Sequence, residues 1–140
     1  MTQEYFRRDR SAGVTAPDLT KLCSVPEHVV RARGKKTNFT SVSLDLARLQ
    51  DLGEAEYRLD SGQTEADRHR IIEHHVLISM LRDVCQNSDK QERARALQGI
   101  RYVKSRLEAL VEWKFDISAV ARKDVITWAY SRIQKYFTKI

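Results

Sequence analysis

Helix-breaking residues are scarce in this sequence and are concentrated near its start. The chain has five glycines and two prolines, and both prolines, Pro17 and Pro26, fall in the first fifth of its 140 residues. An all-β fold of this size needs turn residues at short, regular intervals. The sequence therefore predicts an all-α fold with long helices around one modest core.

Apolar residues recur at helical spacing from residue 41 onward. Intervals of three and four residues place them on one face of a helix. Four segments show this pattern: residues 41–62, 64–87, 89–115 and 118–140. Thr64 and Ser88 are suited to cap the second and third helices, because a hydroxyl oxygen accepts hydrogen bonds from the first backbone N–H groups. Alternation at residues 42–46 leaves a short extended segment as an alternative at the start of the first.

Polar stretches divide the rest of the chain. Residues 1–16 are polar, and we expect them to form a flexible arm. Residues 17–36 contain both prolines and form a small unit, and residues 41–140 form a helical bundle. The expected fold is therefore a four-helix bundle with a small N-terminal unit, together one compact domain.

Charge is distributed unevenly along the chain. The net charge is +6 at pH 7. Residues 1–40 carry eight basic and four acidic side chains, residues 41–89 five and ten, and residues 90–140 twelve and five. A basic surface attracts polyanions. An acidic middle between basic ends equally suits head-to-tail self-association or internal neutralisation, and charge alone does not choose between them. We expect a homo-oligomer in which the bundle supplies self-association.

The sequence has no feature of a membrane anchor or an export signal. No uncharged apolar run approaches the ~18 residues that span a bilayer, and the first residues lack the apolar stretch of a secretory signal. Cys23 and Cys85 are the only cysteines and lie far apart in sequence, which favours reduced thiols. We expect an intracellular protein, cytoplasmic or nucleoid-associated, with no cofactor, metal or membrane partner.

One short segment carries a recognisable pattern. Residues 19–33 read LTKLCSVPEHVVRAR. Leu19 and Leu22 fall where a first helix buries its apolar face, and Pro26 suits the first turn of a second helix. The segment resembles the helix-turn-helix motif of DNA-binding regulators, although Ser24 replaces the usual turn glycine.

This resemblance implies a DNA-binding surface on the second helix of the motif. The residues that it assigns are Glu27, His28 and Arg31 toward base edges, with Arg33, Lys35 and Lys36 near phosphates. The alternative is two short helical turns that pack on the bundle and end in an incidental basic tail.

A second group of residues lies on the expected helix 89–115. At 100° per residue, four side chains fall together opposite the apolar face: Arg95, Tyr102, Arg106 and Trp113. Guanidinium groups beside aromatic rings suit phosphate contact with base stacking, or the anchor of a protein interface. The alternative is that both aromatic rings are buried against a neighbouring helix while the arginines reach solvent.

A third pattern points to catalysis. Residues 68–75 read RHRIIEHH. They resemble the catalytic motif of HEPN-type helical ribonucleases, which implies that Arg68 contacts phosphate and His74 transfers protons. A solvated helical face in the acidic middle of the chain is the simpler interpretation.

These observations order three hypotheses. The first is a non-catalytic, nucleic-acid-associated protein, directed at DNA, with a regulatory or assembly role. The second is a helical adaptor, inhibitor or structural assembly subunit that binds an acidic partner surface. The third is a ribonuclease of the HEPN type. We expect no enzyme on balance, because no glycine-rich phosphate loop, nucleophile elbow or carboxylate pair is evident.

Overall fold

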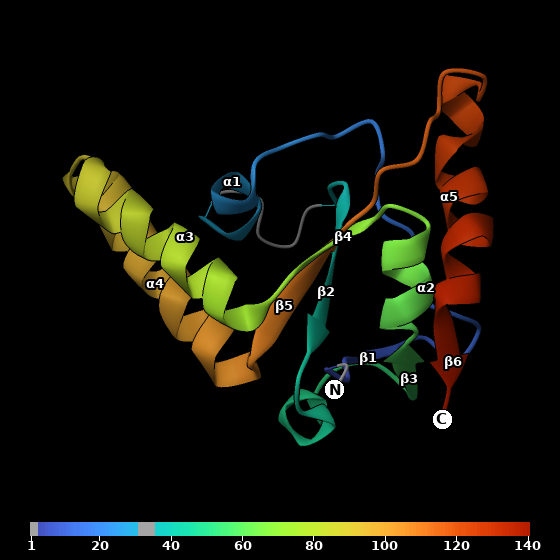
Figure 1. Cartoon of the computed structure of the whole chain (residues 1–140), viewed down its shortest axis with the longest axis horizontal. Helices are drawn as coiled ribbons and strands as arrows, with labels where there is room; N and C mark the ends of the chain where they lie inside the picture. The colour runs from blue at the N-terminus through green and yellow to red at the C-terminus, as the bar shows by residue number, and fades with distance from the viewer. Residues whose placement is uncertain (1–2, 31–35) are drawn as a thin grey trace.

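A six-stranded antiparallel sheet organises the chain in the computed structural model, which describes residues 3–30 and 36–140, the Val30 side chain excepted (Figure 1). The strands are β1 (Phe6–Asp9), β2 (Phe39–Ser43), β3 (Ala55–Leu59), β4 (Arg70–Ile72), β5 (Glu108–Glu112) and β6 (Phe137–Lys139). Their order in the sheet is β4-β5-β2-β1-β3-β6. The prediction of an all-α helical bundle is therefore wrong.

The helices connect and cover these strands. They are α1 (Val25–Val30), α2 (Ser61–Ala66), α3 (His74–Asn87), α4 (Lys90–Arg106) and α5 (Val125–Ile133). Short 3-10 turns are η1 (Leu46–Leu49), η2 (Arg122–Asp124) and η3 (Gln134–Tyr136). Within the described residues, no helix has the length and apolar character needed to cross a membrane.

The expected helix 89–115 stops early and becomes a strand. Leu107 ends α4 in the left-handed conformation, with φ 46°, and its N–H turns back to the carbonyls of Lys104 and Val103. Glu108–Glu112 then pairs with all five residues of β2. The spacing of Leu107, Leu110 and Val111 fits a helix, but a strand buried on both faces has the same apolar content. For this reason, apolar spacing alone does not distinguish a short buried strand from a helix.

The segments expected to be helix or flexible arm contain the other strands. Phe6–Asp9, within the expected arm, forms β1 in the interior of the sheet, between β2 and β3. Residues 41–62 contain the end of β2, then η1 and β3, so the short extended alternative was the better prediction for the start of this segment. The expected helix over 118–140 is regular only in α5.

Two hydrophobic clusters lie on the two sides of the sheet. Leu110 belongs to a cluster with α1, α3 and α4, whereas its neighbours Ala109 and Val111 belong to a second cluster that includes α5. Alternate residues of a strand point to opposite faces. Figure 1 shows this arrangement, with α1, α3 and α4 on one side of the strands and α2 and α5 on the other.

The sheet is weakly joined at its centre. β1 pairs with β3 through four residue pairs, but with β2 through one, Phe6 opposite Ser43. The three strands β4-β5-β2 and the three strands β1-β3-β6 therefore separate beyond this point. The candidate functional site lies at this opening.

Trp113 follows β5 rather than lying on α4, and only 2% of its surface is exposed. Its indole Nε1 donates to Thr40 Oγ1 at 2.7 Å, and its ring packs beside Tyr136 and His69. The aromatic cluster joins β2 and β5 to the C-terminal segment. Trp113 is thus a core residue.

Replacing Trp113 with alanine is expected to lower the free energy of unfolding by about 3–5 kcal/mol, because a large buried ring and its hydrogen bond are lost together. Arg95→Glu is the control, since this side chain is 51% exposed and its reversal should change stability by about half a kcal/mol. Denaturant unfolding of both variants measures the effect. A Trp113→Ala protein as stable as the wild type would contradict this assignment.

Candidate functional site

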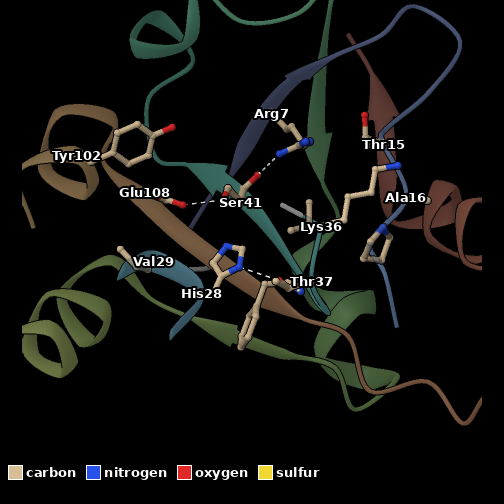
Figure 2. A pocket seen from close by; sticks show the side chains of 13 residues that line it. Arg7, Thr15, Ala16, His28, Val29, Lys36, Thr37, Ser41, Tyr102 and Glu108 are labelled. Carbon is tan, nitrogen blue, oxygen red and sulfur yellow. Dashed lines mark hydrogen bonds between the residues drawn. The ribbon is translucent and has the colours of Figure 1, made fainter. Parts of the chain in front are cut away.

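A cavity of about 570 Å³ opens where β1 and β2 separate. Its walls come from β1, the segment after β1, α1, the start of β2, α4 and the first residue of β5 (Figure 2). The residues that line this central cavity are Arg7, Thr15, Ala16, Pro17, His28, Val29, Lys36, Thr37, Phe39, Thr40, Ser41, Tyr102 and Glu108. Its volume is typical of small-molecule sites.

Glu108 is the acidic group of the central cavity. It is the first residue of β5 and is only 5% exposed. Its Oε1 accepts a hydrogen bond from Ser41 Oγ at 2.6 Å (Figure 2). Burial raises the pKa of Glu108, while the Ser41 hydrogen bond and the charges of Arg7 and Arg106 oppose that rise. A buried carboxyl with a perturbed pKa in a cavity is typical of a functional site.

Arg7 brings a positive charge to the same point from β1. Its Nη1 donates to the Ser41 carbonyl at 2.7 Å, across the opening between β1 and β2. Its Nε donates to Asp9 Oδ2 at 2.8 Å. The guanidinium group is therefore held on two sides, and its Nη2 has no hydrogen-bond partner among the described residues.

Asp9 positions Arg7 and the segment that follows β1. Its carboxylate accepts hydrogen bonds from both the backbone N–H and the hydroxyl of Thr15, at 2.8 and 2.6 Å. Burial by itself would raise the pKa of Asp9, but the Arg7 charge and the Thr15 hydrogen bonds outweigh it and lower the pKa. Asp9 is therefore ionised at neutral pH and fixes one wall of the central cavity.

An aromatic wall faces this charged pair. The His28 ring lies 5.1 Å from the Phe39 ring, and its Nδ1 is 2.7 Å from Thr37 Oγ1. Burial lowers the pKa of His28 to about 4, so the imidazole is neutral at pH 7. α1 reaches this position because Gly99 lets Val29 approach α4: a Cβ at Gly99 would lie 2.9 Å from Val29 Cγ1.

A second, smaller pocket also has Glu108 in its lining. Its volume is about 50 Å³, and it shares Arg7, Ser41, Tyr102 and Glu108 with the central cavity. The additional residues that line it are Arg8, Val42, Leu49, Leu52 and Arg106. Glu108 therefore lies where two pockets meet.

The residues of the helix-turn-helix resemblance fall in different environments. Glu27 is exposed on α1, whereas His28 is largely buried and faces the central cavity. Lys36 is exposed at the rim of the same cavity. Arg31, Arg33 and Lys35 lie outside the described residues. Only α1 is helical among the described residues of 17–36, and the DNA-reading hypothesis stays a prediction.

The group predicted on helix 89–115 is divided. Arg95, Tyr102 and Arg106 do lie on α4, and the Arg106 guanidinium is 5.6 Å from the Tyr102 ring. Trp113 lies beyond β5 in the core, as the burial alternative proposed for it, whereas Tyr102 is 46% exposed. Tyr102 and Arg106 both line the second pocket.

Arg68 and His74 do not share a helix, as the ribonuclease resemblance required. The expected helix 64–87 is interrupted by β4, and Arg68 lies before β4 with φ 68°. His74 begins α3, and its Nδ1 is 2.9 Å from the Glu108 carbonyl oxygen. His74 thereby helps to fix the backbone of Glu108. No group of three or more metal-ligating side chains is found in the part of the chain that the structure describes.

Sequence analysis missed Arg7, Ser41 and Glu108, the three residues that the fold brings together. Arg7 fell in the expected arm. One signal was present: Glu108 interrupts the apolar run Leu107, Ala109, Leu110, Val111, where an acid is costly unless it has a role. Comparison of the chain with protein-family models, curated proteins and solved structures finds no match.

Glu108→Gln is expected to stabilise the fold at neutral pH. The folded-state pKa of Glu108 is raised above 4.5, so the folded state holds its proton more tightly than the unfolded state. The free energy of unfolding therefore falls as pH rises from about 4.5 through the folded-state pKa. The amide of the variant does not ionise, so burial does not penalise a charge at this position. The free energy of unfolding is expected to rise by about 0.5–2 kcal/mol at pH 7.

Thermal unfolding of wild type and Glu108→Gln between pH 4 and 8 measures this gain. The difference in melting temperature should shrink toward pH 4, where Glu108 is protonated in both states. A gain that does not vary with pH, or a loss of stability at pH 7, would contradict the raised pKa.

Proposed function

We propose that the chain is an enzyme of glycosyl transfer that uses a dinucleotide of the NAD⁺ type as donor, so that its reaction is ADP-ribosyl transfer. The observation that carries the proposal is the cluster of Arg7, Ser41 and Glu108 in the central cavity. This departs from the non-catalytic protein that the sequence predicts, because the fold brings these three residues together.

The central cavity suits a phosphate-bearing, aromatic ligand. Arg7 offers guanidinium N–H groups to phosphate oxygens, which arginine recognises by charge and by its planar fork. Lys36 adds a second cation at the rim. His28 and Phe39 supply flat, uncharged surface on which a nucleobase or pyridine ring can stack.

Glu108 is suited to stabilise the positive charge that forms when a glycosidic bond breaks. The transition state of glycosyl transfer resembles an oxocarbenium ion, and most glycosidases use two carboxyl groups, one of them to protonate the leaving group. Glu108 is the only acidic residue among the described residues that line the central cavity. His28, with a pKa of about 4, is a neutral imidazole at pH 7 and lacks the acidic proton of an imidazolium.

The described lining of the central cavity offers a single carboxyl group, and its other candidate proton donors are Lys36 at the rim and Tyr102. A site without a second carboxyl group favours a leaving group that needs no proton. The nicotinamide of NAD⁺ is a pyridinium while bonded to the sugar and departs as a neutral molecule. The C1′–N bond breaks with its electron pair on nicotinamide, and C1′ then bonds to an oxygen or nitrogen of the acceptor. The acceptor's proton passes to Glu108 and from there to water. The single carboxylate thus selects this donor over an O-glycoside.

Ser41 and Arg7 keep Glu108 able to act. Both oppose the effect of burial on its pKa, so they favour the carboxylate that the transition state requires. Because the pKa is nevertheless raised, the acidic limb of the activity profile is expected above the ordinary range of a glutamate.

Nicotinamide release from NAD⁺ by the purified full chain tests the proposal. Glu108→Gln is expected to slow release by about 100-fold or more, as removal of a group that stabilises transition-state charge does, while NAD⁺ binding is retained. Arg7→Gln is expected to weaken NAD⁺ binding by about tenfold or more, since hydrogen bonds to charged groups contribute about 1.5–3 kcal/mol.

Glu112→Gln is the matched control. Glu112 lies on the same strand as Glu108, four residues further on, and does not line the central cavity. It should leave release and binding unchanged. Absence of NAD⁺ binding by the wild type in calorimetry, or equal release by wild type and Glu108→Gln, would refute the proposal.

A further inference from the structure

A transfer reaction needs a place for the acceptor as well as the donor, and the second pocket shares Glu108 with the central cavity. Building on the proposed function, we infer that the acceptor is a nucleic acid strand, held by Arg8 and Arg106 at the second pocket and along α4. The strand would present a nucleophilic oxygen or nitrogen to C1′ of the donor. The C1′–N bond to nicotinamide breaks, the new C1′ bond forms, and the acceptor's proton goes to Glu108.

The charge of the second pocket points to an anionic acceptor. Among its described residues are three arginines, Arg7, Arg8 and Arg106, against Glu108 as the one acid. The Nε–H of Arg8 is buried and has no hydrogen-bond partner. The three arginines also contact acidic side chains outside this lining: Arg7 contacts Asp9 at 2.8 Å, Arg8 contacts Glu56 at 3.5 Å and Arg106 contacts Asp51 at 3.1 Å. The Nε–H of Arg8 is therefore the buried donor that remains for an anionic acceptor.

Arg106 is held by a carboxylate that a phosphate group can replace. Its guanidinium contacts both carboxylate oxygens of Asp51, at 3.1 and 3.3 Å. The Asp51 side chain is 72% exposed and the Arg106 side chain 21%. Because Asp51 lies mostly in solvent, a phosphate of an incoming strand can take its place and accept hydrogen bonds from the same two guanidinium nitrogens.

The surface of α4 extends this site along a line. Arg95 and Arg106 differ by eleven residues, so they lie on nearly the same side of the helix, about 16 Å apart along its axis. Tyr102 projects between them on that side and is 46% exposed. Cations with an aromatic ring among them form the pattern that binds single-stranded nucleic acid through phosphates and base stacking.

A single acidic side chain of a protein is the competing acceptor. It would neutralise one arginine but would make no use of Arg95 or the Tyr102 ring. Of the basic residues on α4, Arg95 and Arg106 lie on the side of the helix that carries Tyr102, while Lys90, Arg93, Arg101 and Lys104 lie about 120–180° away around its axis. A strand with regularly spaced phosphates and stackable bases can contact Arg95, Tyr102 and Arg106 together, which favours a nucleic acid acceptor.

Transfer of label from NAD⁺ carrying ³²P in its adenylate phosphate tests the inference with the full chain. Single-stranded DNA, single-stranded RNA and an acidic peptide of matched length are offered as acceptors, and nicotinamide release is followed in the same reactions. Label is expected on one of the oligonucleotides. Binding of that oligonucleotide should weaken as salt rises, because phosphate contacts release counterions.

The ratio of transferred label to nicotinamide released isolates the acceptor site. The double variant Arg95→Gln with Arg106→Gln is expected to lower this ratio by about tenfold. Arg101→Gln, on the same helix but on its other side, is the control and should leave the ratio unchanged. Arg95→Gln alone should also lower the ratio of transferred label to nicotinamide released. Because Arg95 lies far from Glu108, such a decrease would exclude a local effect on the Glu108 carboxylate.

The outcomes separate the two proposals. Nicotinamide release without label on either oligonucleotide overturns the nucleic acid acceptor and leaves the proposed function standing, and label on the acidic peptide alone assigns a carboxylate acceptor instead. An unchanged ratio in the double variant likewise overturns the role of α4. Absence of nicotinamide release by the wild type removes the proposed function, and the acceptor inference with it.

Discussion

Arg7 connects the two halves of the sheet at the point where their strands separate. It lies on β1, its Nη1 holds the Ser41 carbonyl on β2, and Ser41 in turn holds Glu108 on β5. A carboxyl group buried to this degree is costly without partners. The charge of Arg7 and the hydroxyl of Ser41 offset part of that cost. The contacts that form the site are therefore the same contacts that connect the two halves of the sheet.

The surrounding structure keeps this arrangement in place. Asp9 accepts a hydrogen bond from the Nε–H of Arg7. His74, at the start of α3, contacts the Glu108 carbonyl oxygen and so helps to fix the Glu108 backbone. Leu107, directly before Glu108, has a left-handed conformation that leucine rarely adopts. The close contact of α3 with α4 and the abrupt turn at Leu107 together place Glu108 at the end of a helix and the beginning of a central strand.

Part of the fold could be read from the sequence. Helical spacing indicated helices over the residues of α3 and α4, and on α4 the Arg106 guanidinium lies 5.6 Å from the Tyr102 ring. The sequence does not reveal the strands because each has only three to five residues, and because the short apolar run of β5 has no clear period. The scarcity of glycine and proline favoured helices, yet the strands are joined mostly by helices and longer connections, which need few tight turns.

The sequence by itself determined the amphipathic helices, the basic character of α4 and the presence of one acid, Glu108, within an apolar run. Only the tertiary structure decided that Arg7, Ser41 and Glu108 meet. Pairing between β1, β2 and β5 joins positions 7, 41 and 108, and such contacts depend on strand register and order. No local pattern encodes that order, because it is selected by the burial of whole faces of the sheet under α1, α3, α4 and α5.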